Sequence, residues 1–78
     1  MNEDIIYALE SEGYEAADYG ESIHVWTYDY VSPGPGGTAY LMPNDNMADD
    51  IYEIASMYDS VDVFIDRQSK VVVVEVGV

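Results

Sequence analysis

A single histidine and the absence of cysteine limit the acid–base and covalent chemistry open to this chain. A nucleophile–histidine site would have to be built around His24, which alternates with Trp26 and Tyr28 on one face of an expected strand. A general base also needs an orienting partner and a cleft, which a chain of 78 residues rarely encloses. We therefore expect a packed or surface histidine, no disulfide and no enzyme.

Segment 44–50 has the oxygen-rich composition of a calcium loop but not its spacing. A calcium-binding EF-hand needs oxygen ligands at positions 1, 3 and 5, Gly at 6 and Glu at 12. Starting at Asn44 places Ala48 at position 5 and Asp49 at position 6, and starting at Asp45 places Met47 at position 3. The segment is typical of a capped, acidic helix start. The Gly-rich segment 33–37 carries no Lys, which argues against phosphate binding, so we expect neither metal nor cofactor.

The charge balance is the strongest signal in the sequence. The chain has sixteen Asp and Glu residues and only two basic residues, Arg67 and Lys70, which gives a formal net charge of −14. Solubility of a small domain needs a net charge of only about 2–8 in magnitude. The excess is either part of the function or an adaptation to high salt. It excludes nucleic acid and anionic membranes as direct partners, because both repel carboxylates.

Hydrophobic periodicity predicts the elements that must position these carboxylates. Asn2 is the expected cap of a first helix that ends before Gly13. A second helix follows 43–46 and buries one face; the residues of that face are Met47, Ile51, Ile54, Ala55 and Tyr58. Strands are expected over 14–19, 22–31, 38–42, 61–66 and 70–78, the last with a run of Val typical of a central strand.

The order α-β-β-β-α-β-β shows no repeated strand–helix–strand alternation. It predicts an α+β fold, in which a mainly antiparallel sheet of four or five strands carries both helices on one face. Residues 1–78 form one domain, because the chain has no linker or repeat. The acidic N-terminus lacks a signal sequence, and no apolar run could span a bilayer, so a cytoplasmic location is expected.

Carboxylates recur at spacings suited to rows of Lys and Arg on a partner. Helical residues four apart rise about 6 Å, and alternate strand residues lie about 6.6 Å apart. The candidate partner-binding carboxylates are Asp45, Asp49, Asp50 and Glu53 on the second helix, and Glu10, Glu12, Glu15, Asp18, Asp29, Asp62 and Asp66 elsewhere. A compact body about 30 Å across with this charge approaches the charge density of duplex DNA.

The long strand adds an aromatic candidate surface. If the helices cover one face of the sheet, Ile23 and Val25 belong to the core, and the aromatic residues of the alternating set face away from it: Trp26, Tyr28 and Tyr30. Tyr and Trp dominate the centres of protein interfaces. These rings either form such a centre, for a basic partner or for a second copy of the chain, or pack against neighbouring strands.

In size, charge, lack of Cys and folded α+β character, the chain resembles the small acidic DNA-mimic inhibitors encoded by phages, of the anti-CRISPR and anti-restriction kind. The resemblance covers no motif and carries over no functional residue. It implies a viral protein that binds a basic nucleic-acid-binding complex in the host cytoplasm and occupies its nucleic-acid site. Two other interpretations stay open: an acidic interaction module or subunit of a basic protein, and a salt-adapted domain.

Overall fold

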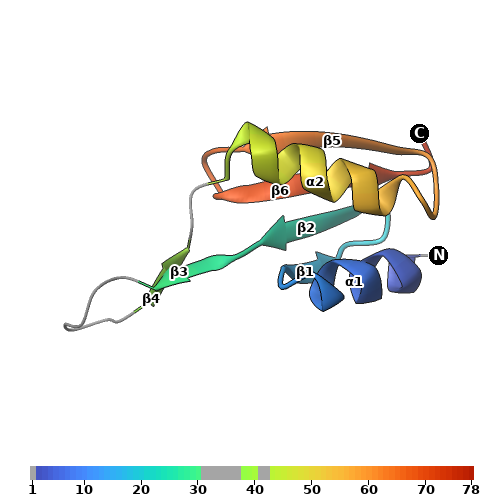
Figure 1. Cartoon of the computed structure of the whole chain (residues 1–78). Helices are drawn as coiled ribbons and strands as arrows, with labels where there is room; N and C mark the ends of the chain where they lie inside the picture. The colour runs from blue at the N-terminus through green and yellow to red at the C-terminus, as the bar shows by residue number, and fades with distance from the viewer. Residues whose placement is uncertain (1, 31–37, 41–42) are drawn as a thin grey trace.

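The computed structural model describes residues 2–30, 38–40 and 43–78. Two helices and a four-stranded antiparallel sheet form the body of the protein, and a short hairpin extends from it (Figure 1). The elements, in chain order, are α1 (Asn2–Ser11), β1 (Glu15–Asp18), β2 (Ser22–Trp26), β3 (Tyr28–Tyr30), β4 (Thr38–Tyr40), α2 (Asp45–Ala55), β5 (Val61–Asp66) and β6 (Val71–Val76).

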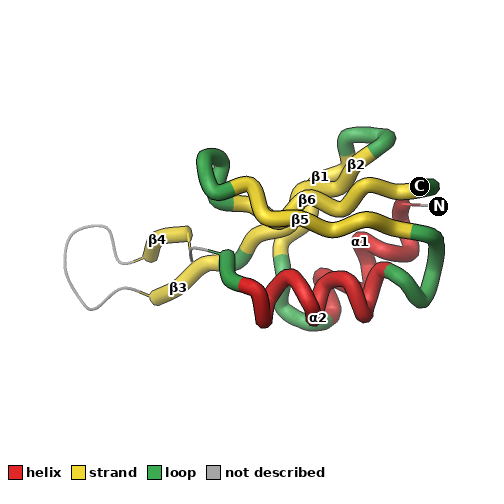
Figure 2. Tube along the Cα trace, turned by 90° about the horizontal axis from the view of Figure 1, so that it is seen from above, coloured by secondary structure: helices red, strands yellow, loops and turns green. Residues whose placement is uncertain are grey.

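The sheet has the strand order β1-β2-β6-β5, and both helices cover the same face (Figure 2). The predicted α+β class and the placement of the helices are therefore confirmed. Strand β6 is central: Val72 pairs with Val25 of β2 on one side and with Ile65 of β5 on the other. This position explains the run of Val, because Val72 and Val74 pack toward the helices, while Val73 on the opposite face is buried between side chains of the two neighbouring strands.

The predicted long strand 22–31 is wrong in one respect, because it is divided between two sheets. Strand β2 ends at Trp26, which pairs with Glu15, the first residue of β1. On its other side the pairing with β6 ends at Val25. With no neighbour to pair with on either side, the chain leaves the sheet, and β3 pairs with β4 in a separate two-stranded ribbon. Residues 31 and 41–42 of the predicted strands lie outside the described residues.

The hairpin makes the molecule longer than a compact chain of this length. The principal extents are 42 × 23 × 21 Å, and the radius of gyration is 12.7 Å. Figure 2 shows the hairpin projecting beyond the four-stranded sheet, away from both helices. The shape is therefore an elongated body with a narrow extension.

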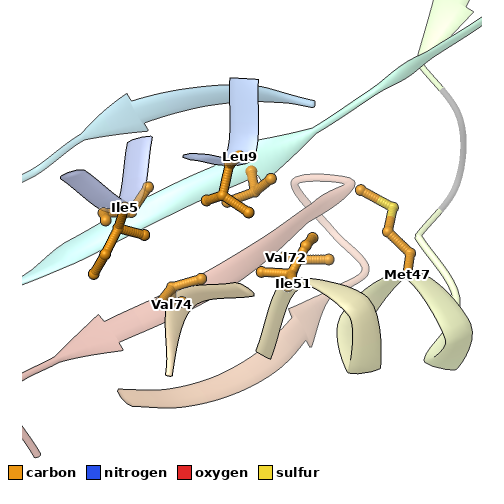
Figure 3. Close-up of a cluster of buried hydrophobic side chains, with 9 residues drawn as sticks. Ile5, Leu9, Met47, Ile51, Val72 and Val74 are labelled. Carbon is orange, nitrogen blue, oxygen red and sulfur yellow. The ribbon is translucent and has the colours of Figure 1, made fainter. Parts of the chain in front are cut away.

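The core lies between the helices and the sheet (Figure 3). It consists of aliphatic side chains and one methionine: Ile5 and Leu9 from α1, Met47, Ile51 and Ala55 from α2, and Ile23, Val25, Val72 and Val74 from the sheet. The Asn44 side chain fixes the start of α2 by accepting a hydrogen bond from the Met47 amide at 2.9 Å. The predicted capped start of this helix is confirmed.

We predict that truncating Ile51 destabilises the protein strongly, because its side chain is fully buried between α2 and the sheet. Ile51→Val should lower the free energy of unfolding by about 1 kcal/mol, and Ile51→Ala by about 2–5 kcal/mol. Glu53→Gln, at an exposed position of the same helix, is the matched control and should change it by less than about 0.5 kcal/mol. Urea denaturation followed by circular dichroism measures all three, and equal effects at the two positions would contradict the packing described here.

Candidate functional site

The outer surface of α2 carries a row of carboxylates. Because Met47, Ile51 and Ala55 occupy the buried side of the helix, its acidic residues are left on the solvent side. All of them are exposed, and together they are called the α2 acidic row: Asp45, Asp49, Asp50 and Glu53. Its members belong to a regular helix anchored in the core, so the row is held rigidly. The four predicted candidates on this helix are thus brought together.

One member of the row is fixed by a side chain from another part of the chain. The Tyr14 hydroxyl donates a hydrogen bond to Asp50 Oδ2 at 2.7 Å, which joins the residue before β1 to α2. Burial raises the pKa of Tyr14 to about 12, and the hydrogen bond and negative charge of Asp50 act in the same direction, with a smaller effect from Glu12. The hydroxyl therefore stays a hydrogen-bond donor above the pH at which an ordinary tyrosine ionises, and it holds the carboxylate in one orientation.

The face of the sheet opposite the helices is called the open face. The strand registers place His24, Val73 and Phe64 side by side across β2, β6 and β5. Val73 is 7% exposed although no helix covers it, while Phe64 remains 45% exposed. The His24 ring also contacts the Tyr19 ring, with 4.3 Å between centroids. Cross-strand packing therefore covers part of this face.

Acidic residues surround the apolar centre of the open face. Trp26 is half-buried and pairs with Glu15, while Asp62 pairs with Glu75. The expected position of Trp26, on the face away from the helices, agrees with the register. Tyr28, Asp29 and Tyr30 form β3, which pairs with β4 in the hairpin and not with the four-stranded sheet that contains Trp26.

Two of the candidate carboxylates stabilise turns. Asp18 Oδ1 accepts hydrogen bonds from Asn2 Nδ2 and the Gly20 amide, both at 2.8 Å, and these bonds lower the pKa of Asp18. Asn2, expected to cap α1, is instead the first residue of that helix, and its side-chain Nδ2 donates to Asp18 and to the Gly20 carbonyl in the turn between β1 and β2.

Asp66 has the corresponding role in the turn between β5 and β6. Its carboxylate accepts from the Ser69 and Gln68 amides at 3.2 and 3.1 Å, and the bond from Ser69 is the main cause of its lowered pKa. This carboxylate is therefore part of the turn, which makes it less free to meet a partner than the exposed Asp62.

The predicted group Glu10, Glu12 and Glu15 is divided between the two sides of the sheet. Glu10 belongs to the last part of α1, and Glu12 follows that helix, on the helix side of the sheet. Glu15 begins β1 and pairs with Trp26 on the open face. All three are exposed, but no single row contains them.

The two basic residues lie in a turn at one end of the four-stranded sheet. Arg67 and Lys70 are both exposed in the turn between β5 and β6. Arg67 lines a hollow of about 380 Å³ together with Asp45 and Asp49, so it lies near the first part of the α2 acidic row. Sequence spacing gives no indication of this proximity. The later members, Asp50 and Glu53, do not line that hollow.

Helix α2 ends earlier than the periodicity indicated. The helix stops at Ala55, and Tyr58, predicted on its buried face, is 49% exposed. The chain turns here, with the Tyr58 and Asp59 amides both donating to the Ala55 carbonyl, so Tyr58 no longer follows the helical repeat. Met57 is 77% exposed beside it. These apolar residues are missed by sequence reasoning, since their pattern resembles that of a buried helix face.

Neither similarity to known proteins nor, in the described part of the chain, a membrane span or metal cluster assigns a function to this chain. Comparison of the chain with protein-family models, curated proteins and solved structures found no significant match. Neither α1 nor α2 has the length and apolar character that a membrane span requires. Among residues 2–30, 38–40 and 43–78, no group of three or more His, Asp or Glu side chains is arranged to hold a metal ion.

We predict that Tyr14 titrates well above an ordinary tyrosine. Its folded-state pKa of about 12 exceeds the ordinary value of 10.0, so its contribution to stability is complete below pH 10.0 and is lost as the pH rises toward 12. Tyrosinate absorbance should show a high-pH step that Tyr14→Phe removes and Asp50→Asn moves to lower pH. If Tyr14→Phe removed only a step near pH 10.0, the Tyr14–Asp50 contact would be contradicted.

Proposed function

We propose that this chain is a DNA-mimic inhibitor that has no enzymatic activity of its own. It occupies a basic nucleic-acid-binding site on a protein partner, such as a host defence complex, and excludes nucleic acid from that site. The observation that supports the proposal is a net charge of −14 on a molecule whose longest extent, hairpin included, is 42 Å. No covalent chemistry is needed for this mode of action.

The charge density resembles that of one nucleic-acid strand. A net charge of −14 over 42 Å corresponds to one charge per about 3 Å. One strand of B-DNA carries a phosphate per about 3.4 Å of axis, and the whole duplex carries one per about 1.7 Å. This value is an average that includes the nearly neutral hairpin, so the charge per unit length along the rest of the molecule is higher. Because Asp29 is the only acidic residue in segment 27–42, the body behind the hairpin carries nearly all of the charge.

The α2 acidic row gives this charge a fixed geometry. Asp45, Asp49 and Glu53 follow one another at four-residue intervals, so each rises about 6 Å above the last. Because the helix backbone is already ordered, only the side chains of the row lose conformational freedom when they meet a partner. Complementary charge also accelerates encounter with a basic surface. The row is therefore the part of the surface that we assign to the Lys- and Arg-lined site of the partner.

A second candidate function is supported by the open face. Its apolar centre at Phe64 is bordered by carboxylates, an arrangement that suits a basic protein partner without any nucleic-acid site. In that case the chain is an acidic interaction module or subunit. The two functions differ in one respect, which is whether nucleic acid and this chain can occupy the partner together.

We predict that the protein competes with labelled duplex DNA for a candidate nuclease or surveillance complex in a gel-shift assay. The double variant Asp49→Lys/Glu53→Lys should slow association by about tenfold at low salt. The matched control Asp62→Lys/Glu75→Lys, on the open face, raises the net charge equally, from −14 to −10, and should have a smaller effect. Formation of a ternary complex at saturating protein would exclude mimicry and support the interaction module.

We also predict that the protein is folded at 0.1 M salt and that added salt raises its melting temperature modestly. Screening weakens the mutual repulsion of the exposed carboxylates, for which the Debye length is about 10 Å at 0.1 M. Melting curves from circular dichroism over a salt series test this. Unfolding at 0.1 M, with folding only at molar salt, would instead indicate a salt-adapted domain.

A further inference from the structure

The exposed large hydrophobic side chains of the described residues gather at one place. Seven such side chains are exposed, and five of them line two adjoining hollows around the C-terminal end of α2. These five are called the helix-end patch: Tyr7, Tyr52, Met57, Tyr58 and Val78. The other two, Tyr19 and Phe64, lie elsewhere. Clustered apolar exposure of this kind marks an interaction site more often than scattered single residues do.

The patch is concave. Its first hollow, of about 290 Å³, lies between Tyr7, Ala8 and Ser11 on α1 and the end of α2, where Ile54, Met57 and Tyr58 line it. The second hollow shares Met57 and Tyr58 with the first and continues past Ser60. Tyr7 and Met57 border the first hollow with 76% and 77% of their surfaces exposed. A groove between two helices with flexible and aromatic walls suits an amphipathic helix.

The surroundings of the patch are negative. Glu12 lines the first hollow and Asp59 the second. Helix α2 ends here with no basic residue in its last turn, so the negative end of its dipole is uncompensated. Within the described part of the chain, the side chains of Arg67 and Lys70 line neither hollow. An apolar groove with this border favours a ligand that carries both apolar and cationic groups.

The same charges disfavour a second copy of the chain as the occupant. Two copies would each bring a net charge of −14 to the contact. The acidic borders at Glu12 and Asp59 would then lie near those of the other copy, and like charges in apposition oppose association. A partner helix with Lys or Arg beside its apolar stripe would instead be attracted, because its positive charges complement the acidic border of the patch.

We propose that the helix-end patch binds a cationic amphipathic helix of the protein partner. Apolar side chains one helical turn apart contact Tyr7, Met57 and Tyr58, while flanking Lys or Arg residues approach Glu12 and Asp59. This proposal rests on the proposed function in taking the partner to be a basic protein. Exposed ion pairs alone contribute little selectivity among basic proteins. The apolar helix-end patch is the feature that would distinguish this partner from other polycations.

The test uses three synthetic probes with the intact chain. They are a helical Leu/Lys peptide with Leu at one-turn intervals, a scrambled peptide of the same composition, and oligolysine of the same charge. Fluorescence anisotropy at 0.15 M salt should show the amphipathic peptide binding about tenfold more tightly than its scramble. Amide shifts in nuclear magnetic resonance spectra should centre on Tyr7, Ile54 and Met57.

Substitutions at exposed positions separate the patch from the rest of the surface. Tyr7→Ser and Met57→Ser should each remove most of the preference for the amphipathic peptide. Tyr19→Ser is the matched control, since Tyr19 is 64% exposed but belongs to neither hollow, and it should retain the preference. Circular dichroism establishes that each variant is folded before binding is compared.

Three outcomes of the peptide and dimer measurements would each overturn the proposal. They are equal binding of the peptide and its scramble, peptide-induced shifts centred on the open face near Phe64, and a dimer of the chain that Met57→Ser dissociates in analytical ultracentrifugation. Loss of DNA competition in the α2 variants, with no effect of Tyr7→Ser or Met57→Ser on either assay, would refute the patch and leave the proposed function intact. Peptide binding at the patch without any DNA competition would refute the proposed function and leave the patch proposal intact.

Discussion

The aliphatic layer between the helices and the sheet opposes the charge repulsion in the molecule. Ile5, Ile51 and Val74 belong to a core in which, among the described residues, no polar or charged side chain is buried. Burying a carboxylate there would cost far more than leaving it in water. The excess charge is therefore confined to the surface, where salt screens it. The fold can accept so many carboxylates because none of those described interrupts the core.

The same layer determines where the chain departs from regular structure. Strand β2 stays in the sheet as far as Trp26, where β1 still provides a partner. Beyond Trp26 the described pairings of β2 with β1 and β6 have ended, and β3 pairs instead with β4 in the hairpin. The hairpin carries little charge, so the elongation of the molecule separates the acidic body from a nearly neutral extension. The end of strand pairing after Trp26 thus accounts both for the length of the molecule and for the position of the acidic residues behind the hairpin.

Local patterns were sufficient to predict most of the fold. The helical spacing of Met47 and Ile51, the alternation around Ile23 and Val25, and the Val run of β6 each reflect burial, which periodicity reports directly. The break after Trp26 was not predictable, because it depends on where β1 and β6 begin and end beside β2. Pairing partners are a property of the tertiary structure.

The candidate site was predictable only where a single element contains it. The α2 acidic row follows from helical spacing, and its exposure follows from the buried side of the helix. The Tyr14–Asp50 hydrogen bond joins residues 36 positions apart, so no local sequence pattern predicts it. The helix-end patch combines Tyr7 of α1 with Met57 and Tyr58 beyond α2. Tyr58 continues the apolar repeat of α2 in the sequence, and it is exposed because the helix ends at Ala55.

Helix α2 places the two surfaces that we assign to binding next to each other. Its 11 residues span about 16 Å. The acidic row runs along its length, and the helix-end patch begins where the helix stops. One side of a standard protein interface covers about 800 Å², so a single partner can contact both surfaces at once. Charge then acts mainly on the rate of encounter, whereas burial of Tyr7 and Met57 acts on the lifetime of the complex. An acidic protein that bound through charge alone would associate with many basic surfaces, and in our proposal the apolar groove is the element that restricts the choice.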